Sequence, residues 1–101
     1  MQRHGEFKTP GGKLVVADVE VADGKIASVA ITGDFFLEPP EALDAITAAL
    51  LGVPADTAEV NLARRVSERL PAGTEMIGFT AESVASAVHR AIHNSTPRER
   101  A

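Results

Sequence analysis

The sequence changes character at Ile31-Thr32-Gly33-Asp34-Phe35-Phe36-Leu37. Before this stretch, apolar and polar residues alternate with the period of a β-strand, and after it the apolar residues recur with the period of a helix. Phe35 and Phe36 are adjacent, and neighbouring side chains of an extended backbone point to opposite faces. Both rings therefore cannot enter one core without a bend, which Gly33 would permit because glycine adopts positive φ at little cost.

The two adjacent rings allow two interpretations. Both can pack in the core after an ordinary turn, since adjacent aromatic residues at a strand end are common in cores. Alternatively, one ring fills the core while the other faces outward or lies beneath a partner. Strand parity continued from Val29 and Ile31 favours Phe35 inside and Phe36 outside.

The residues before this stretch predict an antiparallel meander. We expect residues 1–5 to be a loose lead-in and residues 6–9 to form a short strand. Pro10-Gly11-Gly12 is a strong turn signal. Residues 13–21 then alternate clearly, with valines and an alanine on one face and acidic residues on the other.

Asp23-Gly24 is the dipeptide best suited to a two-residue type I′ hairpin. In the returning strand, residues 25–32, the alternation of apolar and polar residues is interrupted. If this strand paired with residues 13–21 without a bulge, Val29 and Ile31 would lie on the polar face. A one-residue bulge near Ala27-Ser28 restores them to the apolar face, and burying two β-branched side chains outweighs one lost ladder position.

The residues after Phe36 predict three helices. The first begins at Pro39-Pro40, where the missing N–H groups cost nothing, and ends at Gly52. The second opens at Asp56, with Glu59 three residues on as a capping-box variant, and buries a stripe of four residues: Val60, Ala63, Val66 and Leu70.

Thr80 is expected to cap the third helix, with Phe79 stapled against Val84. That helix should bury Val84, Val88 and either Ile92 or Ala91. A short fourth strand could form within residues 74–79. The predicted class is α+β: one domain over residues 1–101, ordered from about 5 to 93 with a polar tail at 94–101, in which three helices pack on one face of a three-stranded antiparallel sheet.

Composition excludes several classes of protein. The 101 residues include no cysteine, which removes disulfides, thiolate catalysis and cysteine-based metal centres, and fits a reducing cytoplasm. No apolar run resembles a signal peptide or a membrane span. A net charge of −4 argues against nucleic acid as a partner, because phosphate binding needs clustered lysine and arginine.

The acidic residues are concentrated in one part of the sequence. No lysine or arginine lies between Lys25 and Arg64, whereas six acids do: Asp34, Glu38, Glu41, Asp44, Asp56 and Glu59. Such a surface would suit a basic patch on another protein. Most of these acids lie at or near expected helix starts, however, where the helix dipole favours them in any case.

Candidate catalytic and metal-binding motifs are weak. His89 and His93 have the spacing of a helical metal pair, but they lack the glutamate and third ligand of a zinc site. The stretch 9–14 contains Gly-Gly-Lys, yet it precedes a strand, whereas a phosphate loop precedes a helix. No residues form a catalytic constellation, which favours a binding or accessory module over a complete enzyme.

Several motifs resemble the C-terminal domain of lipoate–protein ligases. These are Gly12-Lys13-Leu14, Asp23-Gly24-Lys25-Ile26 and Gly33-Asp34-Phe35-Phe36, followed by Leu50-Leu51-Gly52 in the first helix. The resemblance covers about residues 5–93. In most such ligases this domain is fused to a large catalytic domain, so a separate chain resembles the small subunit of the two-part ligases.

The resemblance implies an accessory role without catalytic residues. The large subunit would hold ATP, Mg²⁺ and lipoate, and this chain would support formation of lipoyl-adenylate more than transfer of the lipoyl group. It implies a cytoplasmic heterodimer that serves lipoyl-domain acceptor proteins indirectly, with no nucleic acid or membrane. We expect Gly33, Asp34, Phe35 and Phe36 to meet the large subunit. The alternative is a stand-alone protein-interaction or small-molecule-binding α+β module unrelated to lipoate.

Overall fold

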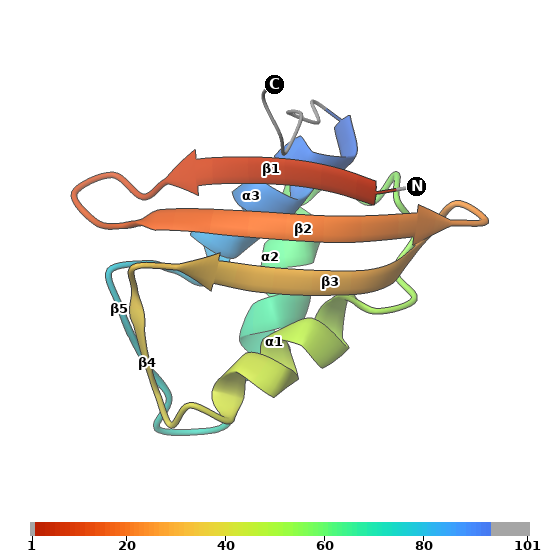
Figure 1. Cartoon of the computed structure of the whole chain (residues 1–101). Helices are drawn as coiled ribbons and strands as arrows, with labels where there is room; N and C mark the ends of the chain where they lie inside the picture. Colours follow the sequence, from red (N-terminus) through yellow and green to blue (C-terminus); the bar gives the residue numbers. More distant parts are fainter. Residues whose placement is uncertain (1, 94–101) are drawn as a thin grey trace.

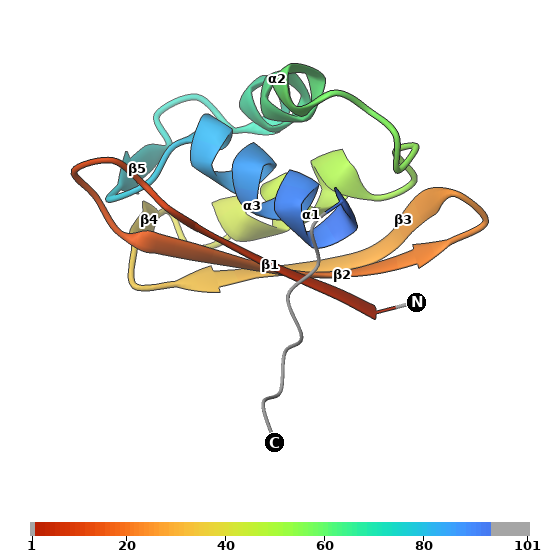
Figure 2. The ribbon, with the colours of Figure 1, turned by 90° about the horizontal axis from the view of Figure 1, so that it is seen from above.

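A computed structural model describes residues 2–93, which form one three-stranded sheet, one two-stranded sheet and three helices. All three helices lie on one face of the larger sheet (Figures 1 and 2). The expected α+β architecture is confirmed, whereas the expected polar tail lies outside the described residues. The elements are β1 (Gln2–Lys8), β2 (Leu14–Ala22), β3 (Lys25–Gly33), β4 (Phe36–Glu38), α1 (Ala42–Leu50), α2 (Glu59–Arg69), β5 (Glu75–Ile77) and α3 (Ala81–His93).

The larger sheet is the predicted meander, with strand order β1-β2-β3 and antiparallel pairing throughout. β2 and β3 are joined by a two-residue turn in which Asp23 and Gly24 have φ of 54° and 74°. Positive φ at both positions is the type I′ geometry, whose twist matches that of the flanking strands. The predicted hairpin is therefore confirmed.

The predicted bulge is also present. Val21 pairs with Ile26, and Glu20 pairs with Ser28, so Ala27 is the extra residue. This shift returns Val29 and Ile31 to the helix-covered face, where both are buried. The local irregularity thus follows from the burial of two β-branched side chains.

β1 is longer than predicted, because the expected lead-in at residues 1–5 is wrong from Gln2 onward. The cause is tertiary packing. Gly5 is buried where β1 crosses α3, and a Cβ atom at this position would lie 2.4 Å from the carbonyl oxygen of Ala87. The imidazole of His4 is hydrogen-bonded across the strands to the carboxylate of Asp18. These two contacts keep β1 in the sheet, although the sequence of this strand does not alternate apolar and polar residues.

α2 forms an outer layer that packs mainly on α1 and α3 (Figure 2). It begins at Glu59, so the expected start at Asp56 is wrong. Thr57 donates its N–H to Pro54 in a turn, and Ala58 is the cap residue without a side-chain bond.

The buried stripe expected for α2 is partly wrong as well. Ala63 and Val66 are buried as predicted, but Leu70 is only partly buried, Val60 is 65% exposed, and Leu62 takes the buried position instead.

α1 buries Ile46 and Leu50, and its Leu43 is partly buried against the core. α1 starts slightly later than predicted, after a turn in which Ala42 donates its N–H to Pro39. Thr80 caps α3 as predicted, since its Oγ1 accepts the N–H of Ser83 at 3.0 Å. Val84, Val88 and Ala91 are fully buried, while Ile92 is partly buried against the core.

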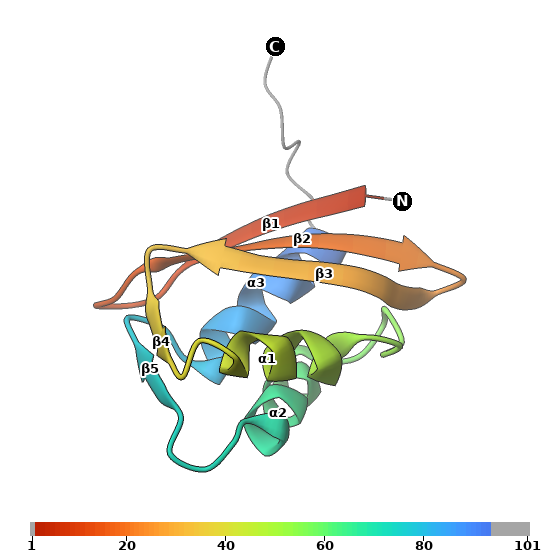
Figure 3. The same ribbon diagram turned by 60° about the horizontal axis from the view of Figure 1, so that its bottom comes forward.

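Residues 74–79 do contain a strand, β5, but it does not join the meander. β5 pairs with β4 in a separate antiparallel ribbon at the end of β3 away from the 23–24 hairpin (Figure 3). Within the described residues, no helix is long and apolar enough to cross a bilayer.

Candidate functional site

The Gly33-Asp34-Phe35-Phe36 motif lies at the junction between the larger sheet and the β4–β5 ribbon. Gly33 ends β3 with φ of 154°, and a Cβ atom here would lie 2.2 Å from the carbonyl oxygen of Leu14 on β2. Only glycine fits this close approach. The chain then turns out of the sheet, and Asp34 is exposed at the turn.

The two phenylalanines of the motif have different environments. Phe35 is partly buried against the core, and its ring stacks on Phe79 with centroids 3.9 Å apart. Phe36 is 68% exposed. This is the arrangement predicted by strand parity. It leaves Phe36 as the ring that is available to a partner, with Phe35 and Gly33 fixing its position.

The β4–β5 ribbon presents a second apolar residue beside Phe36. Ile77 is the direct cross-strand partner of Phe36 and is 54% exposed. The next pair, Leu37 and Met76, points the other way and packs on the core. Sequence reasoning missed Ile77, because a three-residue strand is too short to show a period of two.

The last pair of the ribbon is acidic. Glu38 lies directly opposite Glu75, and both are exposed. Since alternate residues of a strand share a face, the two glutamates lie on the same side as Phe36 and Ile77. These four residues, Phe36, Ile77, Glu38 and Glu75, are called the ribbon face below.

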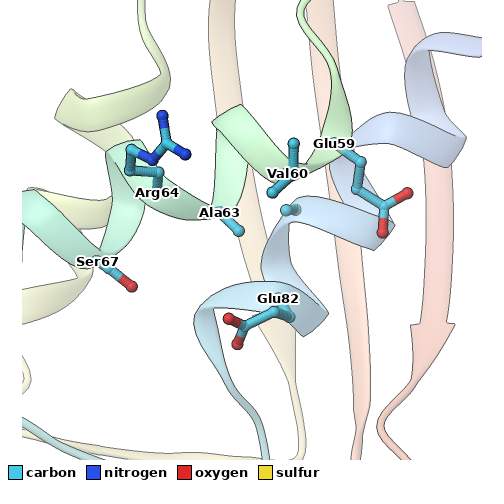
Figure 4. Close-up of a pocket in the computed structure, with 7 residues that line it drawn as sticks. Glu59, Val60, Ala63, Arg64, Ser67 and Glu82 are labelled. Carbon is cyan, nitrogen blue, oxygen red and sulfur yellow. The ribbon is translucent and has the colours of Figure 1, made fainter.

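A groove of about 500 Å³ lies between α2 and α3, on the side away from the sheet (Figure 4). Small and charged residues line it together: Glu59, Val60, Ala63, Arg64, Ser67, Glu82 and Ala85. The carboxylate of Glu59 accepts a hydrogen bond from Ser86 and lies 3.8 Å from Nδ1 of His89. None of the seven lining residues is a histidine or cysteine, so the lining itself offers no nucleophile–histidine pair.

The three histidines occupy two places. The rings of His89 and His93 lie side by side on α3, with centroids 4.3 Å apart. No group of three metal-ligating side chains occurs among the described residues. The Pro10-Gly11-Gly12 stretch connects β1 to β2 as a turn, and the following Lys13 donates its N–H to Gly78 at 2.7 Å.

His4 lies on the face of the sheet opposite the helices, between two carboxylates. Its Nδ1 is 2.7 Å from Asp18 and its Nε2 is 2.9 Å from Glu6. Only the protonated ring can donate to both. The hydrogen bonds to Asp18 and to Glu6 raise the pKa of His4 above its ordinary value, and partial burial opposes them.

The fold is similar to that of a solved protein. A chain from the structure of a bi-partite lipoate protein ligase and its E2 lipoyl domain, from the archaeon Thermoplasma acidophilum, superimposes with a TM-score of 0.69 at 19% sequence identity. The similarity covers 87% of this chain and 94% of that chain. No curated protein sequence matches.

The sequence itself matches a known family. The family described as bacterial lipoate protein ligase C-terminus matches residues 1–68, which include the larger sheet, the Gly33–Phe36 motif, α1 and most of α2. That match extends over two thirds of the chain and contains the motifs on which the resemblance was based. The chain belongs to the family of bacterial lipoate protein ligase C-terminal domains.

Proposed function

We propose that this chain is a non-catalytic accessory subunit of a lipoate–protein ligase, which supports formation of lipoyl-adenylate by a separate large catalytic subunit. The observation that carries the proposal is the family match over residues 1–68. The fold similarity to a chain from the bi-partite Thermoplasma ligase adds to it, since it covers 87% of this chain and 94% of that chain.

In this proposal the catalytic subunit binds ATP, Mg²⁺ and lipoate, as the family resemblance implies, and this chain binds none of them alone. Lipoyl-domain acceptor proteins meet the complex through the catalytic subunit. The complex is a heterodimer in the cytoplasm, in keeping with a sequence that lacks cysteine.

The contact with the catalytic subunit includes the Gly33-Asp34-Phe35-Phe36 segment. Two features of the segment support this assignment. Phe36 is a large aromatic side chain left 68% exposed, and residues of this type are enriched among the anchors of protein interfaces. Phe35 and Gly33 are packed against the core and against Leu14, so they hold the exposed ring in a defined place.

A second candidate function is a small-molecule-binding or stand-alone interaction module. The groove between α2 and α3 favours it, since a volume of about 500 Å³ lies within the range of small-ligand sites. Adding lipoate, ATP or unrelated metabolites to the chain alone would test this candidate, with a shift of the melting temperature as the readout.

Reconstitution tests the accessory role. The chain is purified with a candidate large subunit from the same genome, and lipoyl-adenylate is measured with and without the chain. We expect the two proteins to co-purify, and adenylate to form rapidly only when both are present. ATP- and lipoate-dependent pyrophosphate release by the chain alone would contradict the non-catalytic assignment.

A further inference from the structure

We propose that the ribbon face, composed of Phe36, Ile77, Glu38 and Glu75, is the surface that docks on the catalytic subunit. The complementary segment of that subunit presents an apolar pocket with a lysine or arginine directly beside it. This inference rests on the proposed function, and it names the contact surface and the chemistry of the partner.

The apolar half of the ribbon face is a cross-strand pair. Phe36 and Ile77 are 68% and 54% exposed and lie directly opposite each other, so their side chains form one continuous patch. Leu37 and Met76 beneath them pack on the core. The patch therefore rests on a supported ribbon, and little conformational freedom is lost when it binds a partner.

The patch stands out against the rest of the chain. There are only four phenylalanines and no tryptophan or tyrosine. The other three phenylalanines are buried or partly buried against the core. An aromatic side chain left in water, next to an exposed isoleucine, is the composition expected at the centre of an interface.

The acidic half is the pair Glu38 and Glu75. Like charges directly opposite each other destabilise an antiparallel ribbon. Within residues 2–93, neither carboxylate makes a salt bridge with the described cations. A cation supplied by a partner would relieve this repulsion, and it would also orient the partner relative to the neighbouring apolar patch.

The helix dipole, which explains other acids of the chain, does not explain this pair. Asp44 and Glu59 lie in the first turns of α1 and α2, where a negative charge is stabilised. Glu38 and Glu75 instead lie in strands. The absence of lysine and arginine between Lys25 and Arg64 also leaves no basic neighbour near Glu38 in the sequence.

The same charges argue against a second copy of this chain as the occupant. Two ribbon faces packed against each other would bring four carboxylates into one interface. Like-charge contacts of this kind are strongly unfavourable when desolvated. The occupant is therefore a different, basic surface, and in the proposed function that surface belongs to the catalytic subunit.

Four variants test this docking surface: Phe36→Ala, Ile77→Ala, the double variant Glu38→Gln/Glu75→Gln, and Leu51→Ala as control. Leu51 is an exposed leucine directly after α1. The loop that follows it forms backbone hydrogen bonds with Ile26, at the end of β3 away from the ribbon. Affinity for the large subunit is measured by calorimetry at low and high salt, and the melting temperature of each free variant is recorded.

We expect Phe36→Ala and Ile77→Ala each to weaken binding about fivefold or more without lowering the melting temperature appreciably. The double glutamine variant should weaken binding at low salt and flatten its salt dependence, because the partner's cation has lost its counter-charges. The melting temperature of that free variant should stay the same or rise, since an internal repulsion is removed. A purely structural role for the pair would not improve stability while impairing binding.

The outcomes separate the two proposals. If the wild-type chain binds the large subunit and supports adenylate formation, but all ribbon variants bind as well as Leu51→Ala, the docking surface is wrong and the accessory function stands. If the wild-type chain neither binds nor supports adenylate formation, the accessory function is wrong, and the proposed docking surface, which rests on it, is wrong too. A wild-type dimer that Phe36→Ala converts to a monomer, as seen by light scattering, would identify a second copy as the occupant and overturn the inference.

Discussion

The ring of Phe35 stacks on the ring of Phe79, with centroids 3.9 Å apart and an angle of 18° between the ring planes. Phe35 comes from the junction of β3 and β4, and Phe79 directly precedes the cap of α3. This one contact therefore joins the end of the larger sheet, the ribbon and the start of the most buried helix.

Truncation of the two adjacent phenylalanines should separate folding from binding. Phe35→Ala removes the stacked ring and should lower the free energy of unfolding by about 3 kcal/mol, which for a domain of this size lowers the melting temperature by roughly 10 °C or more. Phe36→Ala should leave thermal unfolding almost unchanged because its ring is in water. Thermal melts of both variants, followed by circular dichroism, provide the measurement.

An equal loss of stability in both variants would mean that Phe36 is part of the core. In that case its proposed contact with a partner would lose its basis.

The crossing of β1 over α3 should not tolerate a side chain at Gly5. A Cβ atom there would lie 2.4 Å from both the Ala87 carbonyl oxygen and the Ala91 amide nitrogen, and backbone atoms of a helix cannot easily move aside. Gly5→Ala should cost about 1–3 kcal/mol or prevent folding. Gly11→Ala is the control, since no atom beyond its two chain neighbours lies within 4 Å of its Cβ and only its positive φ carries a penalty. Urea titration of the two variants measures the difference, and equal midpoints would contradict this packing.

The hairpin turn should also be sensitive to substitution. Gly24 has φ of 74°, a conformation that β-branched residues avoid. Gly24→Val should therefore cost about 1 kcal/mol or more, whereas Gly24→Asn should be milder because asparagine tolerates this region. Melting temperatures that are unchanged for valine would show that the turn relaxes to another geometry.

Stability should depend on pH through His4. Its pKa in the folded chain is raised above 6.5 by hydrogen bonds to Asp18 and Glu6, so the protonated ring favours the folded state. That contribution is fully present below the ordinary pKa and is lost as the pH rises through the raised pKa. The wild-type melting temperature should therefore fall as the pH rises from about 6.5 through the raised pKa of His4. His4→Gln should fall less over the same range, and identical pH profiles would contradict the role of His4.

Much of the larger sheet could be predicted from the sequence, because its determinants are local. Asp23-Gly24 specifies the turn, and the position of Val29 relative to Val21 then requires an extra residue, which the structure places at Ala27. The buried residues of α3 likewise follow from helical spacing. Apart from the turn, each of these features depends on a side-chain period that several consecutive residues repeat.

The features that could not be predicted depend on contacts between distant segments. Gln2–Lys8 forms a strand because Gly5 meets α3 and His4 meets Asp18, and neither contact leaves a periodic signal. Val60 and Leu62 are both apolar, and only the position of α2 on α1 and α3 decides that Leu62 is buried. The pairing of β4 with β5, and with it the exposure of Ile77 beside Phe36, is fixed by segments almost forty residues apart.

The central claim, an accessory role in lipoate activation, is tested most directly by measuring the two half-reactions of a large catalytic subunit separately. One assay measures lipoyl-adenylate formation from lipoate and ATP, and the other measures transfer of lipoyl from preformed adenylate to a lipoyl domain, each with and without this chain. The account predicts that the chain strongly accelerates adenylate formation and changes transfer much less. Equal rates of adenylate formation with and without the chain, under conditions in which the catalytic subunit is active, would contradict it.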